Sequence, residues 1–244
     1  MRKGFCLLLL PLLSVLPLHA EDQDTGLGIE IEVSHKICKG LEGAIEAEVR
    51  TQDGVGDLER LAIGAGLDYK VTKWLKADAG YLLLMRNIPE HQSAKYRWEQ
   101  YWSPRHRAYL SMTGSWDISK HWTISLRERY QYTYETMRYA QRHYLSDGHR
   151  GSDKIEGGDN EQLLRSRLQI KWSRKKSAWS PYANVEMLND LQDGLSLDQM
   201  RYTAGCDYKI NKHNALGLSY RFKDKSDRDE AKGHLLTFKY AYEF

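Results

Sequence analysis

The sequence predicts an all-β fold: a transmembrane antiparallel up-and-down β-barrel of about 10–12 strands, with short periplasmic turns and long external loops. Three observations predict it. Apolar and polar residues alternate with a period of two, short and long connections alternate along the chain, and the last strand alternates aromatic with polar or small residues. All three are typical of outer-membrane barrels.

The N-terminus has the layout of a cleavable secretory signal at residues 1–20. Arg2 and Lys3 are followed by a leucine-rich apolar stretch, which ends on the small residue Ala20 before two acidic residues. This stretch is too short for a membrane anchor. We therefore expect residues 21–244 to form a single barrel domain in the outer membrane of a Gram-negative cell.

Composition excludes several other classes. No apolar stretch beyond the N-terminus is long enough for a membrane helix, and the mean hydropathy is −0.67. Without Arg2 and Lys3, the 36 basic residues become 34 against 33 acidic ones, so no global charge would gather nucleic acid. Only Cys38 and Cys206 follow the signal, too few for a disulfide framework.

The alternation is clearest at 61–71, 200–210 and 216–222, where apolar or aromatic residues occupy every second position. Such a pattern directs one set of side chains to each face of a strand. The predicted strands cover 27–37, 41–50, 59–71, 75–86, 105–118, 122–135, 163–173, 179–189, 199–210, 214–223 and 233–244. These are eleven segments, whereas bacterial single-chain barrels usually have an even number. We therefore expect ten or twelve strands.

The connections fall into two alternating classes, as outer-membrane barrels require. The short ones are 38–40, 72–74, 119–121, 174–178 and 211–213. The long polar ones are 52–58, 87–104, 136–162, 190–198 and 224–232. Trp74, Trp122, Trp172 and Trp179 all lie near short turns, which predicts an aromatic girdle at that edge of the barrel.

The chain ends on a strand whose aromatic residues lie on one face. They are Phe238, Tyr240, Tyr242 and Phe244. This end resembles the terminal strand that outer-membrane barrels present to the barrel assembly machinery. We therefore expect that machinery and outer-membrane lipid to be partners of the chain.

The order of these patterns resembles a known family. The relevant stretches are an apolar-alternating segment at 29–37 with an acidic strand ending in Arg50, then LLRSRLQIKW (163–172), YANVEML (182–188), RYTAGCDYKINKH (201–213) and LGLSYRF (216–222). They resemble the uncharacterised outer-membrane β-barrel family known as domain of unknown function twenty-four-ninety. The resemblance spans nearly the whole chain after the signal. It implies the fold, and it implies no catalytic residues.

Candidate enzyme and metal residues are sparse. A nucleophilic serine needs a base within hydrogen-bond reach, and the nearest local pair is His91 and Ser93 in a long loop. His106 is expected on the lipid face, with Ser103 on the opposite face. His35, His121 and His213 lie near short turns, where packing at the membrane interface is the simpler reading. We predict no catalytic residue, metal or cofactor; an outer-membrane lipid hydrolase or acylase is the minor enzymatic alternative.

The expected lumen carries two charged walls. The acidic wall consists of Glu30, Glu32, Glu42, Glu46 and Glu48. The basic wall consists of Arg105, Arg107, Arg127, Arg129, Arg165 and Arg167. If the walls face each other across a narrow lumen, they close it with ion pairs; if water fills it, they create a transverse field that orients small polar solutes. Barrels near eight strands are filled by side chains, so a mostly occluded lumen is favoured.

Three functions fit this architecture. The leading one is a narrow, porin-like channel or a ligand-binding surface barrel for a small polar solute. The second is a structural or interaction barrel with a salt-bridged closed lumen. The third is an outer-membrane lipid-modifying enzyme. Nucleic acid is not an expected partner, because the basic clusters lie on a barrel wall or in a short turn.

Overall fold

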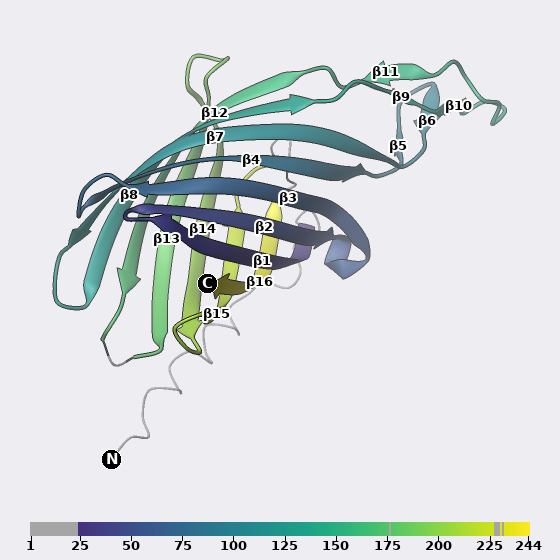
Figure 1. Cartoon of the computed structure of the whole chain (residues 1–244). Helices are drawn as coiled ribbons and strands as arrows, with labels where there is room; N and C mark the ends of the chain where they lie inside the picture. The colour runs from purple at the N-terminus through teal and green to yellow at the C-terminus, as the bar shows by residue number, and fades with distance from the viewer. Residues whose placement is uncertain (1–23, 176, 227–229, 231) are drawn as a thin grey trace.

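The chain forms a closed β-barrel in a computed structural model that describes residues 24–175, 177–226, 230 and 232–244 (Figure 1). The predicted signal at 1–20 lies outside these residues. The barrel strands are β1 (Asp24–Cys38), β2 (Leu41–Gln52), β3 (Asp57–Lys70), β4 (Leu75–Ile88), β7 (Tyr101–Asp117), β8 (Trp122–Glu135), β12 (Asn160–Trp172), β13 (Trp179–Asp190), β14 (Ser196–Lys209), β15 (Asn214–Lys223) and β16 (Gly233–Glu243).

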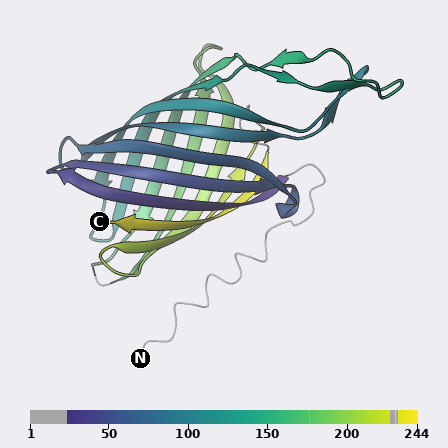
Figure 2. The ribbon, with the colours of Figure 1, turned by 45° about the vertical axis from the view of Figure 1, so that its right-hand side comes forward.

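The expectation of an even strand number is wrong for the described residues, because the barrel closes with eleven strands. Ten of the junctions are antiparallel. The eleventh joins β1 to β16 in parallel, from Asp24 opposite Gly233 to Ser34 opposite Glu243. An odd up-and-down count leaves the first and last strands running in the same direction, so only a parallel seam can close it. Figure 2 shows the yellow C-terminal strand beside the purple N-terminal strand at this seam.

The two longest connections hold small sheets beyond the barrel rim (Figure 1). One has three strands in the order β10 (Arg142–Tyr144), β6 (Tyr96–Trp98) and β5 (His91–Gln92). The other pairs β11 (Lys154–Glu156) with β9 (Arg138–Ala140). A short 3-10 helix, η2 (Asp53–Val55), lies between β2 and β3. Among the described residues, no helix is long and apolar enough to cross a membrane.

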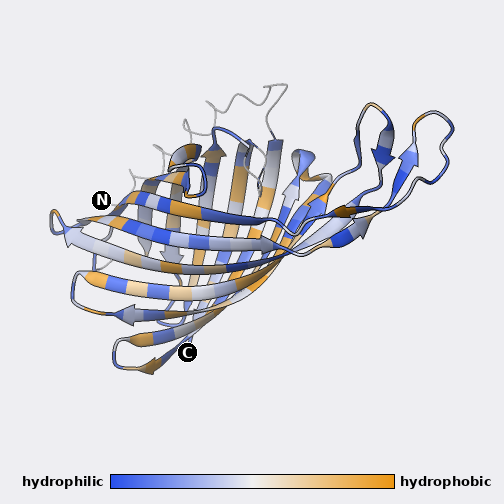
Figure 3. Cartoon of the chain, turned by 90° about the horizontal axis from the view of Figure 1, so that it is seen from above, coloured by the Kyte–Doolittle hydropathy of each residue, from blue (hydrophilic) through white to orange (hydrophobic). Residues whose placement is uncertain are grey.

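The strands alternate between an apolar outer face and a polar inner face, and Figure 3 shows this alternation along the ribbons. Ile29, Ile63 and Leu110 are examples of large apolar side chains that are more than half exposed on the outside. A water-soluble barrel would bury such side chains, whereas a barrel in lipid presents them to hydrocarbon. The alternation predicted from sequence therefore gives the inside-out pattern of a membrane barrel.

Aromatic residues cluster beside the short turns. Trp74 stacks on Trp116 with ring centroids 6.4 Å apart, and Trp179 lies 4.5 Å from Tyr208. His121 packs near Trp172 at 6.2 Å. These contacts form an aromatic band at one edge of the apolar surface, where amphipathic rings lie at the lipid–water interface.

Candidate functional site

The lumen contains both charged sets that were expected there. Strands β1 and β2 present Glu30, Glu32, Glu42, Glu46 and Glu48 on their inner faces. Strands β7, β8 and β12 present Arg105, Arg107, Arg127, Arg129, Arg165 and Arg167. The arginines of β8 and β12 are cross-strand neighbours, since Arg129 pairs with Arg165 and Arg127 pairs with Arg167.

A packed layer fills the lumen at the long-loop end. Each of the eleven strands contributes at least one inward residue that is buried there. The apolar members of this layer are Leu84, Leu163, Leu188 and Leu235. Its fully buried polar members include Ser103 and Gln199. Buried side chains from the whole circumference leave little space for water at this level.

Glu230 is the anionic centre of one half of this layer. It lies in the connection between β15 and β16 and is 2% exposed. Its carboxylate is 2.6 Å from Arg50 and 3.3 Å from Arg60, with Lys223 at 3.6 Å and Arg201 at 3.8 Å. Burial alone would raise its pKa, but the surrounding cations hold the pKa of Glu230 well below its usual range.

Glu186 is the anionic centre of the other half of the packed layer. It lies on β13 and its carboxylate is 2.5 Å from Arg127 and 2.7 Å from Arg165. Arg129 lies 3.2 Å from Asp78 and its guanidinium stacks 3.9 Å from the centre of the Tyr109 ring. Buried ions need partners of this kind, because desolvation is costly without them.

The two walls are not paired with each other in the way that was expected. Glu48 bonds to Arg50 and Arg60 of β2 and β3, each at 2.7 Å. Glu32 bonds to Lys239 of the neighbouring strand β16, also at 2.7 Å. On one face of a sheet, adjacent side chains are only about 5–8 Å apart, whereas the opposite wall lies across the barrel. Side chains on the same strand or on neighbouring strands are therefore closer partners for these charges than side chains on the opposite wall.

Sequence reasoning missed several charged residues of the layer, among them Arg50, Arg60, Glu186 and Glu230. Arg50, Arg60 and Glu186 lie at inward positions of predicted strands, so the alternation was sufficient to find them. Glu230 lies in a long polar connection, and no periodic pattern marks it as lumenal. The loop must fold back into the barrel before its carboxylate can reach the cations.

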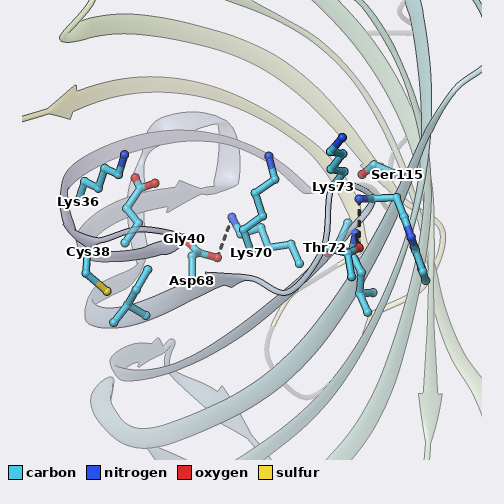
Figure 4. A pocket seen from close by; sticks show the side chains of 14 residues that line it. Lys36, Cys38, Gly40, Asp68, Lys70, Thr72, Lys73 and Ser115 are labelled. Atoms are coloured by element: carbon cyan, nitrogen blue, oxygen red, sulfur yellow. Dashed lines mark hydrogen bonds and ion pairs between the residues drawn. The ribbon is translucent and has the colours of Figure 1, made fainter.

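The short-turn end of the lumen is open by comparison. A cavity of about 450 Å³ lies inside the turns that join β1 to β2 and β3 to β4 (Figure 4). Its lining includes Lys36, Lys70 and Lys73, together with the pair formed by Lys76 and Asp68 at 2.7 Å. Further round the wall, Lys171 bonds to Asp207 at 2.7 Å with both side chains partly exposed.

The residues considered for catalysis are not brought together. The His91 ring stacks on Trp98 at 5.0 Å, while the Ser93 hydroxyl lies 3.2 Å from the Tyr96 amide, which donates to it. Ser103 points into the lumen and donates to Glu135. His106 is on the outer face, where its ring nitrogen is 2.5 Å from the Tyr81 hydroxyl.

The turn-proximal histidines pack against aromatic rings. His35 lies 6.1 Å from Phe244, and His213 lies 6.2 Å from Tyr242. Among the described residues, no group of three or more His, Cys, Asp or Glu side chains is placed to hold a metal ion.

The terminal aromatics all lie on the outer face of β16 or directly after it. Phe238, Tyr240 and Phe244 are exposed large apolar residues, and Tyr242 packs edge-on to Phe244 at 4.9 Å. The backbone N–H of Phe244 donates to the Ser34 carbonyl, so the last residue is tied to β1. The aromatic alternation thus faces the surroundings of the barrel beside its seam.

Comparison with solved structures identifies the class, an outer-membrane-type β-barrel. The translocator domain of the autotransporter NalP from Neisseria meningitidis is similar over 80% of this chain and 72% of its own, with 11% identity and a TM-score of 0.56. The β domain of the Bordetella autotransporter BrkA is similar over 86% of each chain, with 16% identity and a TM-score of 0.50. The porin NanC covers 91% of this chain at 12% identity and a TM-score of 0.49.

The particular family follows from the sequence match. The family described as "Protein of unknown function (DUF2490)" matches residues 29–232. The chain belongs to this family, as the strand-turn-strand patterns indicated. No curated protein matches the sequence significantly.

Proposed function

We propose that the chain is an exported barrel of the Gram-negative outer membrane that does not act as an open diffusion pore. Its lumen is a charged chamber that opens to the periplasm and is closed at the external end by the ion-paired layer. One observation carries this proposal: inward residues at the long-loop end are buried on every strand, whereas Lys171, Asp207 and Lys239 towards the short turns remain partly exposed.

This arrangement favours an interaction or binding role over passive conduction. The chamber has an acidic wall on β1 and β2 and cations on the facing strands, so it suits a small polar solute or a charged partner segment entering from the periplasm. The external loops carry their own small sheets, which give a second surface for docking. A closed, salt-bridged barrel was one of the alternatives left open by the sequence.

Cysteine accessibility tests the closed end directly. In a background with Cys38→Ser and Cys206→Ser, Ser125→Cys and Thr133→Cys place thiols on the inner face of the same strand. Ser125 is partly exposed near the short turn, and Thr133 is buried in the layer. A membrane-impermeant maleimide should label position 125 at least about tenfold faster than position 133, and the barrel should show no steady conductance in a planar bilayer. Equal labelling with steady conductance would show an open channel.

A gated pore is the second candidate, and Glu230 is the observation that favours it. One carboxylate from one loop holds cations of β2, β3, β14 and β15 together. If the contacts of Glu230 open and close the lumen, Glu230→Gln should raise the frequency of conducting events while the barrel stays inserted. If it only closes the barrel permanently, the same substitution should change stability without conductance.

Enzymatic activity on lipid is not favoured. Ser93 and His91 have separate partners, and Ser103 and His106 lie on opposite faces of β7. A serine without a base in reach is a weak nucleophile. Hydrolysis of phospholipid or lipopolysaccharide ester bonds by the purified barrel, lost on Ser93→Ala, would reverse this choice.

A further inference from the structure

Glu128 is an ionisable residue on the lipid-facing side of the barrel. It lies on β8 between Trp122 at one end of the strand and Tyr134 at the other, and its side chain is exposed. Its outward neighbours along the strand are Leu126 and Tyr130. Among the described outward positions in the middle of the barrel strands, away from both rims, it is the one carboxylate. An ionisable side chain that faces hydrocarbon has a high free-energy cost, so its presence usually indicates a functional site.

Ser166 is the residue that Glu128 contacts. The two are direct cross-strand partners on β8 and β12, and the Ser166 hydroxyl donates to Glu128 Oε2 over 2.6 Å. The surrounding outward residues, including Met112 and Leu168, are apolar and exposed. One hydroxyl does not satisfy a carboxyl group, which can accept about four hydrogen bonds. In lipid the remaining capacity would have no partner.

The placement of this pair is self-complementary. Because Glu128 and Ser166 are cross-strand partners on neighbouring strands, the barrel tilt of about 35–45° separates their heights in the membrane by only about 3 Å. A two-fold axis along the membrane normal, passing between β8 and β12, preserves height and sets β8 of one copy against β12 of the other. The Ser166 O–H of each copy already donates to Glu128 of its own chain, so the contact between copies is the reverse one: the protonated carboxyl group of each Glu128 donates its O–H to the Ser166 oxygen of the other copy.

The same two strands carry an apolar surface outside the membrane. Strand β8 is followed by β9 and β12 is preceded by β11, which pair with each other beyond the rim (Figure 1). Tyr139 and Ile155 are cross-strand partners in this ribbon and are 73% and 56% exposed. Large exposed apolar side chains grouped in this way are typical of interaction surfaces.

We propose that two copies of the chain pair side by side in the membrane through the β8–β12 face, with Glu128 and Ser166 at the two-fold axis and the β9–β11 ribbons extending the contact outside. The pairing rests on insertion of the barrel in a membrane, which is part of the proposed function. Apolar contacts around the polar centre supply area, and the reciprocal carboxyl–hydroxyl contacts fix the register of the two barrels.

The test counts subunits of the full barrel in liposomes at low protein density, using single-molecule photobleaching of a dye on the exposed Cys38 in a background with Cys206→Ser. Glu128→Leu should lower the dimerisation constant at least about tenfold, which corresponds to about 1.4 kcal/mol of association free energy. Glu128→Gln keeps the hydrogen-bonding groups and should remain largely dimeric. Ile31→Ala is the control, because β1 is equally far from β8 and β12 around the barrel.

Insertion is measured separately by the gel shift between unboiled and boiled samples. A wild-type barrel that inserts but is monomeric overturns the pairing alone, as does an inserted Glu128→Leu variant that is as dimeric as wild type. A wild-type chain that fails to enter liposomes overturns the membrane placement, and the pairing with it.

Discussion

Replacing Glu230 by glutamine should destabilise the barrel strongly, because the change leaves buried cations without their shared anion. The side chain keeps its size and one carbonyl oxygen, so packing is nearly unchanged. What is lost is a full negative charge beside Arg50 and Arg60, at 2.6 and 3.3 Å, with Lys223 and Arg201 within 3.8 Å.

The magnitude follows from the partners that remain. Removing one member of a buried ion pair costs about 3–5 kcal/mol. Arg50 and Arg60 keep Glu48 as a partner, so we expect the lower end, about 3 kcal/mol. For a chain of this length, 1 kcal/mol lowers the melting temperature by about 2–4 °C. Glu230→Gln should therefore melt about 6–12 °C below wild type.

The assay is thermal unfolding in detergent micelles, followed by circular dichroism and by the gel shift. Glu90→Gln is the matched control, since Glu90 lies in another long loop and pairs with Arg97 at 3.6 Å with both side chains half exposed; such pairs contribute about 0–1 kcal/mol. The double variant Glu230→Gln with Lys223→Gln should recover part of the loss. A melting temperature for Glu230→Gln equal to that of the control would refute the ion-paired layer.

Three further outcomes are expected. Ala47→Arg puts a charge on the lipid face and should lower the free energy of unfolding by about 2–4 kcal/mol. Ala44→Arg on the inner face of the same strand should be tolerated, because glutamates lie beside it. The reverse ranking of the two variants in urea titrations would mean that the strand faces are misassigned. Changing Tyr242 and Phe244 to serine should lower the membrane-inserted yield in cells, and unchanged yield would exclude a role in assembly. The pKa of Glu230 in the folded barrel lies well below its ordinary value of 4.5. The stabilisation by Glu230 is therefore complete above about pH 4.5 and is lost as the pH falls through the lower folded-state pKa. The difference in melting temperature between wild type and Glu230→Gln should persist at about pH 7 and shrink at about pH 3.

The alternation in the sequence was sufficient to predict the barrel and the inward face of the two charged walls. A period of two is a local property, so the inward placement of Glu46 or Arg127 can be read from its neighbours along one strand. The number of strands was harder to predict. The alternation delimits eleven segments, but the even number that is usual in bacterial barrels argues against eleven. The parallel seam between β1 and β16 depends on residues at opposite ends of the chain, which no local pattern connects.

Charge partners were less predictable than faces, because pairing depends on register between strands. Register sets Glu48 beside Arg60, and it sets Arg165 between Arg129 of β8 and the acidic Glu186 of β13. The sequence also could not predict which side chains come into close contact inside the lumen. A Cβ at Gly205 would lie 2.7 Å from the Tyr182 ring, so this inward glycine makes room for an aromatic side chain of the adjacent strand.

An odd number of strands sends the two ends of the barrel to opposite sides of the membrane. Strand β1 begins at the long-loop rim, where the Asp24 amide donates to the Lys232 carbonyl, and the chain finishes at the short-turn rim, where Phe244 meets Ser34. With the barrel oriented in the outer membrane as proposed, an epitope placed before Asp24 would be accessible from the medium, and one placed after Phe244 from the periplasm. In that orientation the start of β1 would have to cross the bilayer during assembly, a step that a barrel built wholly from paired hairpins does not need.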